Sequence, residues 1–299
     1  MNVNGTDISI TNPEKLLWID SRVTKLDYVH YLLKVSDYLL PYTKDRMLMY
    51  WLYPRGLNHS KVEKRSLPTG APDWISSTFY KGKERILLND QATLIWLANL
   101  QALELHVPFD QYTHQDFPTE LVFDLDPSTD EFDLVLETAL ELKAVLDGMG
   151  LQSIPKTSGK TGLQVYVPIQ PNFSFEETRM INQFVAEYML EKLPDKITLD
   201  RVKKRRGKKL YFDYLQLWKG RTMAAPYSVR ATKEASVSTP VTWQEVEEGF
   251  KPSDFTMEVI LKRIKEKGDL FRVVRTEKEQ NNQRLNDVLA FLKAREKST

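Results

Sequence analysis

The chain has 299 residues, and its 42 basic and 41 acidic side chains leave a formal net charge of only +1. The overall charge therefore argues neither for nor against nucleic acid, and local clusters must decide that question. The absence of cysteine excludes disulfides, thiolate metal sites and cysteine nucleophiles. No apolar run approaches the roughly 20 residues of a membrane span, and the N-terminus lacks the form of a signal peptide, so we expect a soluble intracellular protein without a membrane partner.

The first third of the chain mixes short strands with two helices. Periodicity and capping residues predict a strand at 7–10 and then a helix opened by a capping box of Thr24 and Asp27. A strand at 47–53 and a surface loop at 54–73 follow. A second helix is predicted from Asp90 to about Glu104, where residues 105–108 break it. This order favours a mixed arrangement over a purely parallel sheet.

The segment 118–127 (Pro-Thr-Glu-Leu-Val-Phe-Asp-Leu-Asp-Pro) carries the strongest chemical signal. It predicts a strand in which Asp124 and Asp126 point to the same face, close enough to share a cation, with Pro127 ending the ladder behind them. Two carboxylates so close favour either a bound cation or a raised pKa, and Mg²⁺ or Mn²⁺ suits oxygen ligands. Three interpretations are open at this point: a polar turn, an Asp-x-Asp phosphatase and a metal-dependent nucleotidyltransferase.

The elements after this strand follow the same mixed pattern. We predict a helix at 132–146, strands at 151–155 and 163–169, a helix from the capping box of Ser174 and Glu177 to about Leu190, strands at 196–202 and 209–215, helices opened by Thr242 with Glu245 and by Ser253, and a polar last helix from about Thr276.

Several polar residues in this part can serve a nucleotidyltransferase. Asp213 lies inside an apolar strand, where an unpaired carboxylate is costly, and it offers a third metal ligand; the alternative is an edge strand that faces water. The loop 157–162 has two glycines, two hydroxyls and Lys160, so it can cradle phosphate, although it lacks the spacing of a P-loop and equally fits a plain hairpin. The basic run 201–209 is of a kind that usually forms a solvated hairpin tip, but here it leads directly into the Asp213 strand, which favours an Arg206 that faces phosphate.

Two residues elsewhere have weaker signals. Arg230 ends the segment Pro226-Tyr227-Ser228-Val229-Arg230, and a planar guanidinium suits triphosphate recognition. His106 can donate to phosphate, but a lone histidine is more often structural. The phosphatase alternative weakens because Gly268-Asp269 is followed by Leu-Phe-Arg-Val-Val, without the further acid that it needs.

With these residues in view, the sequence resembles the polymerase domain of bacterial ligase D, a member of the archaeo-eukaryotic primase superfamily. The resemblance extends from Asn12 to about Glu248 and rests on motifs in order. They are Asn-Pro-Glu-Lys at 12–15, Thr-Lys at 24–25, Leu-His at 105–106, Phe-Asp-Leu-Asp-Pro at 123–127, Lys-Thr-Ser-Gly at 156–159, Asp-Tyr-Leu-Gln at 213–216 and Ala-Pro-Tyr-Ser-Val-Arg at 225–230.

The resemblance implies a template-directed polymerase that fills gaps at DNA double-strand breaks, tends to prefer ribonucleotides and often uses Mn²⁺. It implies three sets of residues: metal ligands Asp124, Asp126 and Asp213; nucleotide contacts His106, Ser158, Gly159, Lys160, Gln164, Arg206, Gln216 and Arg230; and a grip on the downstream 5′-phosphate by Asn12, Lys15 and Lys25. The charge of the two lysines and the directional donor of Asn12 also suit a phosphate pocket.

The chain departs from the family pattern at four places. Gln164 stands where the family usually has His, Lys160 lies one residue before the usual loop lysine, and Leu217 replaces an Asn. Residues 57–67 lack the aromatics with which relatives often stack on the template. None of these changes removes a metal ligand.

We therefore predict a mixed α/β (α+β) fold of the archaeo-eukaryotic primase type, with an RRM-like catalytic sheet packed with a mixed N-terminal subdomain. Residues 1–299 are expected to form one primase-polymerase domain, in which 1–110 carry the 5′-phosphate pocket, 111–250 the catalytic core and 251–299 the C-terminal helices.

The predicted function is gap-filling nucleotidyl transfer by a two-metal mechanism in bacterial non-homologous end joining. The expected partners are DNA with gaps or broken 5′-phosphorylated ends, NTP or dNTP, a Ku-type protein and a ligase domain, in the cytoplasm at the nucleoid. The alternatives are a primase that starts chains de novo and a weakly catalytic module that binds 5′-phosphorylated ends.

Overall fold

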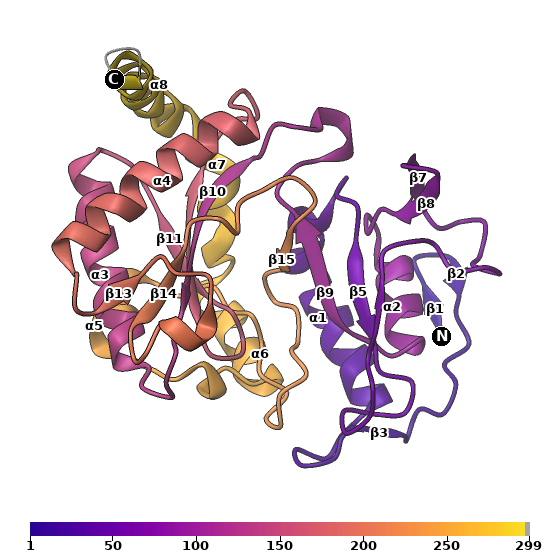
Figure 1. The fold of residues 1–299 in the computed structure, drawn as a ribbon. Helices are drawn as coiled ribbons and strands as arrows, with labels where there is room; N and C mark the ends of the chain where they lie inside the picture. Colours follow the sequence, from indigo (N-terminus) through magenta and orange to yellow (C-terminus); the bar gives the residue numbers. More distant parts are fainter. Residues whose placement is uncertain (297–299) are drawn as a thin grey trace. The chain divides into compact units, whose positions relative to one another are not determined.

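The computed structural model describes residues 1–296 and divides the chain into two compact units. Unit 1 comprises residues 1–113, 222–239 and 253–269, and unit 2 comprises 114–221, 240–252 and the described residues from 270 onward (Figure 1). Each unit is therefore assembled from separated stretches of the chain. The expected C-terminal helical part includes residues 297–299, which lie outside the described residues, and the predicted three-part division stays a prediction.

Unit 1 is built on a four-stranded antiparallel sheet. Its strand order is β15 (Thr222–Ala224), β9 (Ala102–Pro108), β5 (Met49–Leu52) and β6 (Val62–Lys64). Helices α1 (Lys25–Thr43) and α2 (Gln91–Asn99) pack against each other beside this sheet, and α6 (Met257–Lys267) packs on α1 (Figure 1). Three small hairpins complete the unit: β1 (Asn2–Val3) with β2 (Thr6–Asp7), β3 (Leu16–Trp18) with β4 (Val23–Thr24), and β7 (Ser77–Tyr80) with β8 (Lys83–Ile86).

Aromatic side chains with polar tips hold the core of unit 1 together. Trp18 and Tyr28 are fully buried and meet edge to face with ring centroids 5.3 Å apart. The Tyr28 hydroxyl donates to the Ala102 carbonyl oxygen at 2.9 Å, so the start of β9 is tied to α1. Tyr31 makes the equivalent bond to the Tyr227 carbonyl oxygen at 2.8 Å. Buried phenols need such partners, and here they attach distant chain segments to one helix.

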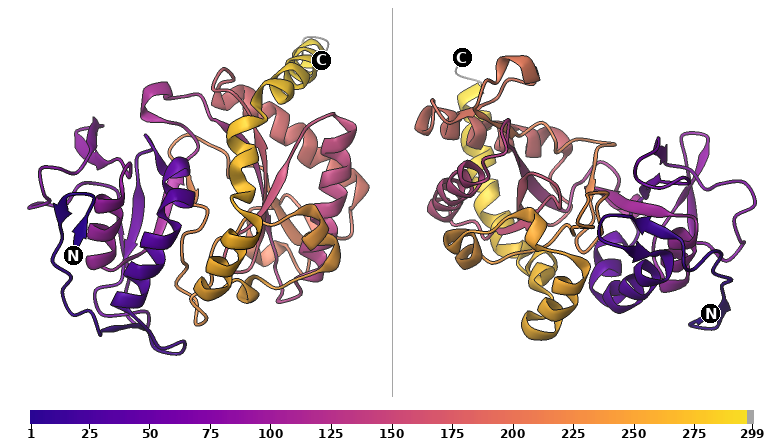
Figure 2. Two further views of the ribbon diagram at one scale, coloured as in Figure 1. Left: turned by 180° about the vertical axis from the view of Figure 1, so that it is seen from behind. Right: turned by 90° about the horizontal axis from the view of Figure 1, so that it is seen from below.

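Unit 2 contains the five-stranded sheet on which the Asp-x-Asp segment lies. Its strand order is β11 (Ile154–Thr157), β12 (Leu163–Pro168), β10 (Glu120–Asp126), β14 (Leu210–Asp213) and β13 (Ile197–Thr198), antiparallel except between β13 and β14. The helices around it are α3 (Asp133–Gly148), α4 (Phe175–Lys192), α5 (Trp243–Glu248), α7 (Val273–Thr276) and α8 (Lys278–Glu296). Of these, α7 and the start of α8 lie along β12 (Figure 2).

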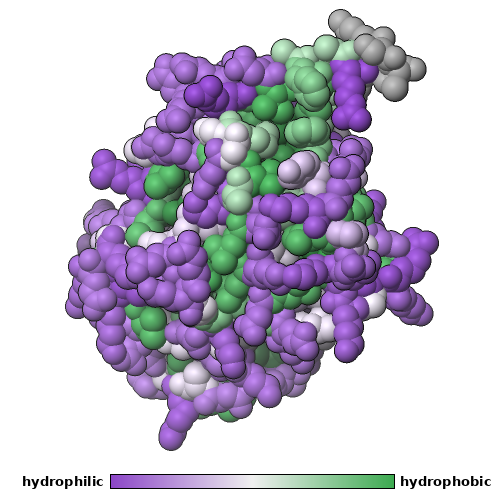
Figure 3. Space-filling model, turned by 90° about the vertical axis from the view of Figure 1, so that its left-hand side faces the viewer, coloured by the Kyte–Doolittle hydropathy of each residue, from purple (hydrophilic) through white to green (hydrophobic). Residues whose placement is uncertain are grey.

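Helix α8 is anchored at its N-terminal half by two buried asparagines. Asn281 donates to the carbonyl oxygens of Gln152 and Pro168, at 3.1 and 2.9 Å, and Asn282 accepts the Gln170 amide at 2.8 Å. Further along, Phe291 is largely exposed and contacts Phe184 of α4. Figure 3 shows apolar side chains gathered on this face of unit 2, beside a groove between α3 and α4 that Ala144, Gly148, Phe184 and Tyr188 help to line.

The helix starts were predicted well from local chemistry. Capping boxes form at Thr24 with Asp27, Ser174 with Glu177, and Thr242 with Glu245, as expected. Each box is decided by side chains three residues apart, so it needs no tertiary information. No helix within residues 1–296 is long and apolar enough to cross a membrane.

Some predicted elements are wrong. The helix capped by Asp90 ends at Asn99 rather than near Glu104, and residues 102–108 form strand β9 instead of a helix break. Gln101 has a φ of +63°, which reverses the chain there. Nearly all of β9 is buried, so it lacks the alternation that marks a half-exposed strand. The predicted loop 54–73 contains β6, and the helix expected at Ser253 begins after Thr256, following a short 3₁₀ turn at Pro252–Asp254.

Candidate active site

The three predicted metal ligands lie on neighbouring strands of the unit 2 sheet. Asp124 and Asp126 come from β10, and Asp213 is the last residue of β14. In the antiparallel register Asp124 stands directly opposite Asp213. Residues directly opposite each other, and residues two apart on one strand, share a face of the sheet. The fold therefore brings all three carboxylates to one face.

Burial and mutual repulsion act on this group together. Burial raises the pKa of Asp124 well above its usual range, and the nearby charges of Asp126 and Asp213 raise it further. Burial and then Asp213 also raise the pKa of Asp126, while the positive charges of Arg206 and Lys203 oppose that rise. None of the three aspartates forms an ion pair within residues 1–296. A cation would relieve this repulsion.

The carboxylate oxygens of the three aspartates suit a hard divalent cation, but they do not form a complete coordination shell. Oδ1 of Asp124 is buried and accepts no hydrogen bond from any described residue, which leaves a lone pair for a ligand that the chain itself does not supply. Oδ1 of Asp213, in contrast, accepts the Tyr211 hydroxyl at 3.0 Å and the Leu215 amide at 2.9 Å. Within residues 1–296 no three acidic or histidine side chains converge closely enough to form a ready-made metal site.

The glycine loop between β11 and β12 is closed by its own serine. Ser158 Oγ accepts the amides of Lys160 and Gly162, at 3.2 and 3.0 Å, and the Ser158 amide donates to the Gly162 carbonyl oxygen at 2.9 Å. Gly159 adopts a φ of +72°, the left-handed region that glycine allows. Two of the amides that were expected to cradle phosphate are thus engaged with Ser158 in this state.

Gly162 brings this loop against the carboxylate strand. A Cβ atom at this position would lie 2.6 Å from the Leu125 carbonyl oxygen and 3.4 Å from Oδ1 of Asp126. The first distance is shorter than any real contact of this kind, so only glycine fits without movement of the backbone. The glycine therefore sets how closely the loop approaches the strand that carries both aspartates.

Arg206 and Gln216 lie on the β14 side of the sheet. The Arg206 guanidinium stacks 3.7 Å from the Tyr211 ring centroid and donates to the Asp200 carbonyl oxygen at 2.9 Å. Gln216 Oε1 accepts from Arg221 at 3.3 Å. Both residues belong to unit 2 with the aspartates, as do Ser158, Gly159, Lys160 and Gln164.

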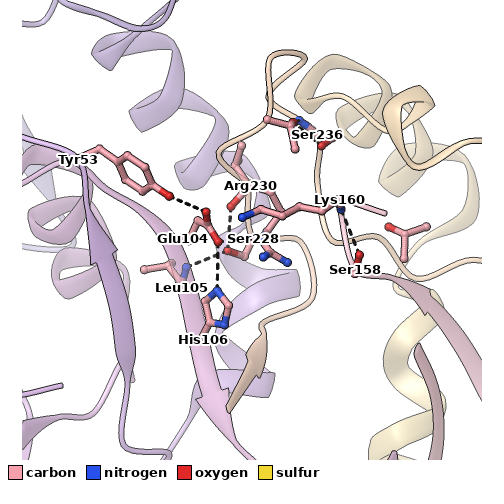
Figure 4. Close-up of polar contacts among 12 residues, drawn as sticks. Tyr53, Glu104, Leu105, His106, Ser158, Lys160, Ser228, Arg230 and Ser236 are labelled. Atoms are coloured by element: carbon pink, nitrogen blue, oxygen red, sulfur yellow. Dashed lines mark hydrogen bonds and ion pairs between the residues drawn. The ribbon is translucent and has the colours of Figure 1, made fainter. Parts of the chain in front are cut away.

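His106 and Arg230 belong to unit 1, where they share a buried carboxylate (Figure 4). Glu104 is 1% exposed; its Oε2 accepts Arg230 Nε at 3.0 Å and lies 3.4 Å from His106 Nε2. Its Oε1 accepts the Tyr53 hydroxyl at 2.7 Å. Because a carboxylate only accepts, His106 Nε2 carries a proton in this contact. Burial and the Glu104 charge raise the pKa of Tyr53 well above its usual range, which keeps the phenol neutral.

The segment that carries Arg230 is tied to β9 and to the rest of unit 1. Ser228 Oγ accepts the Leu105 amide at 3.2 Å (Figure 4), and the Arg230 amide donates to the Ser236 carbonyl oxygen at 2.7 Å. Tyr227, two residues before Val229, has a φ of +64°, an uncommon conformation for an aromatic residue. Val229 forms an isolated antiparallel bridge with Val237, and Arg230 follows it directly.

Lys15 and Lys25, predicted to bind a 5′-phosphate, point at protein oxygens in unit 1. Lys15 Nζ donates to the Pro54 carbonyl oxygen and to Gln101 Oε1, both at 2.8 Å. Lys25 Nζ is 3.0 Å from the Asn99 carbonyl oxygen and 3.3 Å from Thr11 Oγ1, and the Lys25 side chain is almost fully buried. Burial, and then the charge of Lys15, lower the pKa of Lys25. Asn12 has a φ of +48° in the turn before Lys15.

The prediction missed two buried residues that contact the predicted set. In the sequence, Glu104 stands out only as the approximate end of a predicted helix, and Lys156 only as the start of the Lys-Thr-Ser-Gly motif. Lys156 is fully buried and donates to Gln164 Oε1 at 2.6 Å. The available signal was a charged residue inside an otherwise apolar strand. An unpaired charge inside an apolar strand is costly, and this cost points to Glu104 and Lys156 as much as to Asp213.

Comparisons with known proteins agree on one family. Residues 24–271 match the family model described as LigD, primase-polymerase domain. The chain is 40% identical over 263 residues to the bifunctional non-homologous end joining protein LigD of Bacillus subtilis, covering 87% of this chain and 43% of that protein. It is 29% identical to the multifunctional LigD of Mycolicibacterium smegmatis, covering 88% of this chain and 35% of that protein.

A solved structure confirms the predicted fold type. The polymerase domain of Mycobacterium tuberculosis ligase D in complex with DNA superposes with a TM-score of 0.83 at 27% identity, covering 90% of this chain and 98% of that one. The chain spans less than half the length of the curated relatives it matches. The resemblance seen in the motifs is thereby confirmed: the chain belongs to the family of LigD primase-polymerase domains, which are nucleotidyltransferases of the archaeo-eukaryotic primase type.

Proposed function

We propose that this chain is a template-directed polymerase that fills gaps at DNA double-strand breaks in bacterial non-homologous end joining. The observation that carries the proposal is the set of Asp124, Asp126 and Asp213 on one face of the β10–β14 pair, in a chain that matches the LigD primase-polymerase family over residues 24–271. The relatives' names include non-homologous end joining. A carboxylate trio of this kind suits nucleotidyl transfer.

The proposed chemistry is in-line attack of a primer 3′-hydroxyl on the α-phosphate of a bound NTP or dNTP, with pyrophosphate as the leaving group. Two Mn²⁺ or Mg²⁺ ions would supply charge neutralisation of the phosphate and activation of the hydroxyl. Asp124, Asp126 and Asp213 would hold them. Oδ1 of Asp124 has no hydrogen-bond partner within residues 1–296, which supports this assignment because a buried lone pair needs a partner.

The remaining predicted contacts are assigned to the nucleotide. In unit 2 these are Ser158, Gly159, Lys160, Gln164, Arg206 and Gln216, and in unit 1 they are His106 and Arg230. Glu104 supports the last two, because it contacts both side chains from a buried position. We expect a preference for ribonucleotides, which the family resemblance implies.

A second element of the proposal is recognition of the DNA end. Asn12, Lys15 and Lys25 would bind the 5′-phosphate on the downstream side of a gap. The like charges of Lys15 and Lys25 are close enough to lower the pKa of Lys25, so an anion between them would stabilise both. The related polymerase domain was solved with DNA. A ligase domain and a Ku-type protein are the expected partners in repair.

Primer extension on a gapped duplex tests the proposal. Wild type, with Mn²⁺ and either rNTPs or dNTPs, should add the nucleotide complementary to the template, faster with rNTPs and faster when the downstream strand carries a 5′-phosphate. The variant Asp124→Ala/Asp126→Ala should add none. A matched control, Asp130→Ala/Asp195→Ala, removes two exposed carboxylates of unit 2 and should extend like wild type.

Other outcomes have definite meanings. Addition without a primer on a single strand would favour a primase instead. If wild type adds nothing under either nucleotide set but still binds the 5′-phosphorylated end, the chain acts as an end-binding module. Equal activity in the Asp124→Ala/Asp126→Ala variant would contradict the assignment of the site.

A further inference from the structure

A row of four polar side chains crosses the sheet of unit 2. In the strand register Lys156 of β11 stands opposite Gln164 of β12, Gln164 opposite Asp124 of β10, and Asp124 opposite Asp213 of β14. Directly opposite residues share a face of the sheet, so a cation, an amide and two carboxylates follow one another across four strands. We propose that Lys156 and Gln164 form a buried relay that orients the Asp124 carboxylate toward a divalent cation.

The first member of the relay is a lysine without access to water. Lys156 has an exposed fraction of 0%, and burial of an ammonium group is costly unless strong partners replace its hydration. Its Nζ donates to Gln164 Oε1 at 2.6 Å and to the Thr157 carbonyl oxygen at 3.4 Å, and it lies 5.5 Å from the Tyr166 ring centroid. The shortest of these contacts is the one that leads toward the carboxylates.

The chemistry of the two neighbours determines how the Gln164 amide is oriented. An ammonium group only donates, so the amide oxygen of Gln164 faces Lys156. The Tyr166 hydroxyl donates to the same oxygen at 3.4 Å. The NH₂ end then faces Asp124, whose carboxylate accepts a hydrogen bond from the Gln164 side chain. Both ends of the amide are engaged, and the Gln164 side chain is 4% exposed.

This arrangement holds one metal ligand before any metal is bound. The Asp124 carboxylate accepts a hydrogen bond from Gln164, while Oδ1 of Asp124 has no hydrogen-bond partner within residues 1–296. The positive charge of Lys156 also acts on the same carboxylate, and it opposes the repulsion from Asp126 and Asp213. A rigid, partly neutralised carboxylate with one oxygen left over is a preorganised ligand, as outer partners of metal ligands commonly provide.

The inference deepens the proposed function, on which it rests, and it assigns positioning roles to two residues. Gln164 was predicted to contact the nucleotide, and the two roles make different demands. A nucleotide contact affects the KM for NTP and leaves binding of metal alone unchanged. A relay to Asp124 affects binding of metal alone, in the absence of nucleotide and DNA.

The test is Mn²⁺ binding by the full chain without nucleotide or DNA, followed by the electron paramagnetic resonance signal of free Mn²⁺. Gln164→Met and Lys156→Met should each weaken Mn²⁺ binding by about 10- to 100-fold, the usual effect of removing an outer partner of a metal ligand. The double variant Lys156→Met/Gln164→Met should be no weaker than either single variant, because the two residues act in series. Tyr166→Phe is the matched control, since it removes one hydroxyl and keeps the ring, and it should bind within about twofold of wild type.

The double variant also covers the risk that a single variant misfolds. A buried ammonium that has lost its shortest hydrogen bond is more costly than two apolar side chains, so the double variant should fold, as judged by circular dichroism, even if Gln164→Met does not. Unchanged Mn²⁺ affinity in the folded double variant would overturn the inference. So would a raised KM for NTP in Gln164→Met with Mn²⁺ binding unaltered.

The inference and the proposed function can fail separately. If wild type extends primers and the Lys156 and Gln164 variants bind Mn²⁺ as tightly as wild type, the relay alone is overturned. A wild type that binds Mn²⁺ through the relay but extends no primer would overturn the polymerase proposal and leave the relay in place.

Discussion

The two units differ in whether their buried carboxylates are neutralised by other side chains. In unit 1 the buried carboxylate of Glu104 is surrounded by donors, from Arg230, His106 and Tyr53, so its charge is neutralised within the protein. In unit 2 three aspartates gather on one face without an ion pair among the described residues, and the pKa values of Asp124 and Asp126 are raised.

The difference indicates what each cluster does without a ligand. A neutralised buried pair holds its own geometry, so the Glu104 cluster is a rigid support for two side chains that are predicted to meet a nucleotide. A group of carboxylates whose mutual repulsion is only partly offset destabilises the fold that carries it, and such strain persists where function requires it. We therefore expect substitutions in unit 1 to affect mainly stability and substitutions in unit 2 to affect mainly catalysis.

The largest effect is expected for Asp213→Asn. The amide keeps the shape and the bonds from Tyr211 and Leu215 but loses the charge that a metal ligand supplies. Loss of several kcal/mol of transition-state stabilisation corresponds to a fall of about 10³-fold or more in the single-turnover rate of primer extension. The thermal midpoint should not fall. Asp195→Asn makes the same change at an exposed carboxylate of unit 2, so it is the control and should extend primers at the wild-type rate. A rate for Asp213→Asn within tenfold of wild type would contradict the ligand role.

Glu104→Ala should destabilise the protein most. Removing one member of a buried ion pair takes the carboxylate away from Arg230 and costs about 3–5 kcal/mol, measured by chemical denaturation. Glu63→Ala, which breaks the exposed Glu63–Arg65 pair of the same unit, should cost less than about 1 kcal/mol.

The double variant Glu104→Leu/Arg230→Met separates charge from packing. It should recover part of the stability lost in Glu104→Ala, because both charges of the pair are then replaced by apolar side chains. Equal costs for Glu104→Ala and Glu63→Ala would refute the contrast between a neutralised internal cluster and a surface pair.

Gly162→Ala should have an intermediate effect, confined to unit 2. The added methyl meets the Leu125 carbonyl oxygen at 2.6 Å, so the strand between Asp124 and Asp126 must shift. Such overpacking costs about 1–3 kcal/mol, and we expect the rate of primer extension to fall with it. Gly148→Ala is the matched control because nothing lies within 4 Å of its added methyl. Wild-type extension by Gly162→Ala would show that the close approach has no bearing on the carboxylates.

The smallest expected effect is a pH dependence at Lys25. Its folded-state pKa is below 10.5 because burial and Lys15 disfavour the charged form. As pH rises toward 10.5, the folded chain therefore loses this proton before the unfolded chain does, so the stability penalty of the buried charge diminishes with rising pH in that window. The charge available for a phosphate diminishes with it.

Binding measurements on DNA ends isolate this effect. The affinity ratio between a 5′-phosphorylated and a 5′-hydroxyl end, measured by fluorescence anisotropy, should fall by about two- to threefold over the upper part of that window, since one charge contact is lost. Lys25→Met should abolish the pH dependence of the ratio. A ratio that stays constant with pH in wild type would remove Lys25 from the phosphate pocket.

The local chemistry of the chain was enough to predict several features. Capping boxes such as Thr24 with Asp27 depend on side chains three residues apart. The shared face of Asp124 and Asp126 follows from the two-residue period of a strand. Order and spacing of motifs indicated the family, which the comparisons confirm.

Other features required the folded chain, because they depend on which strands become neighbours. Strand β9 was mistaken for a helix end, since burial on both faces erases the alternation that marks a strand. The contact of Glu104 with Arg230 joins residues 126 positions apart. The row from Lys156 through Gln164 to Asp124 exists only in the register of three strands. Residue types and local spacing determine which chemistry the chain carries, whereas long-range pairing decides which charges are neutralised and which are left for a ligand.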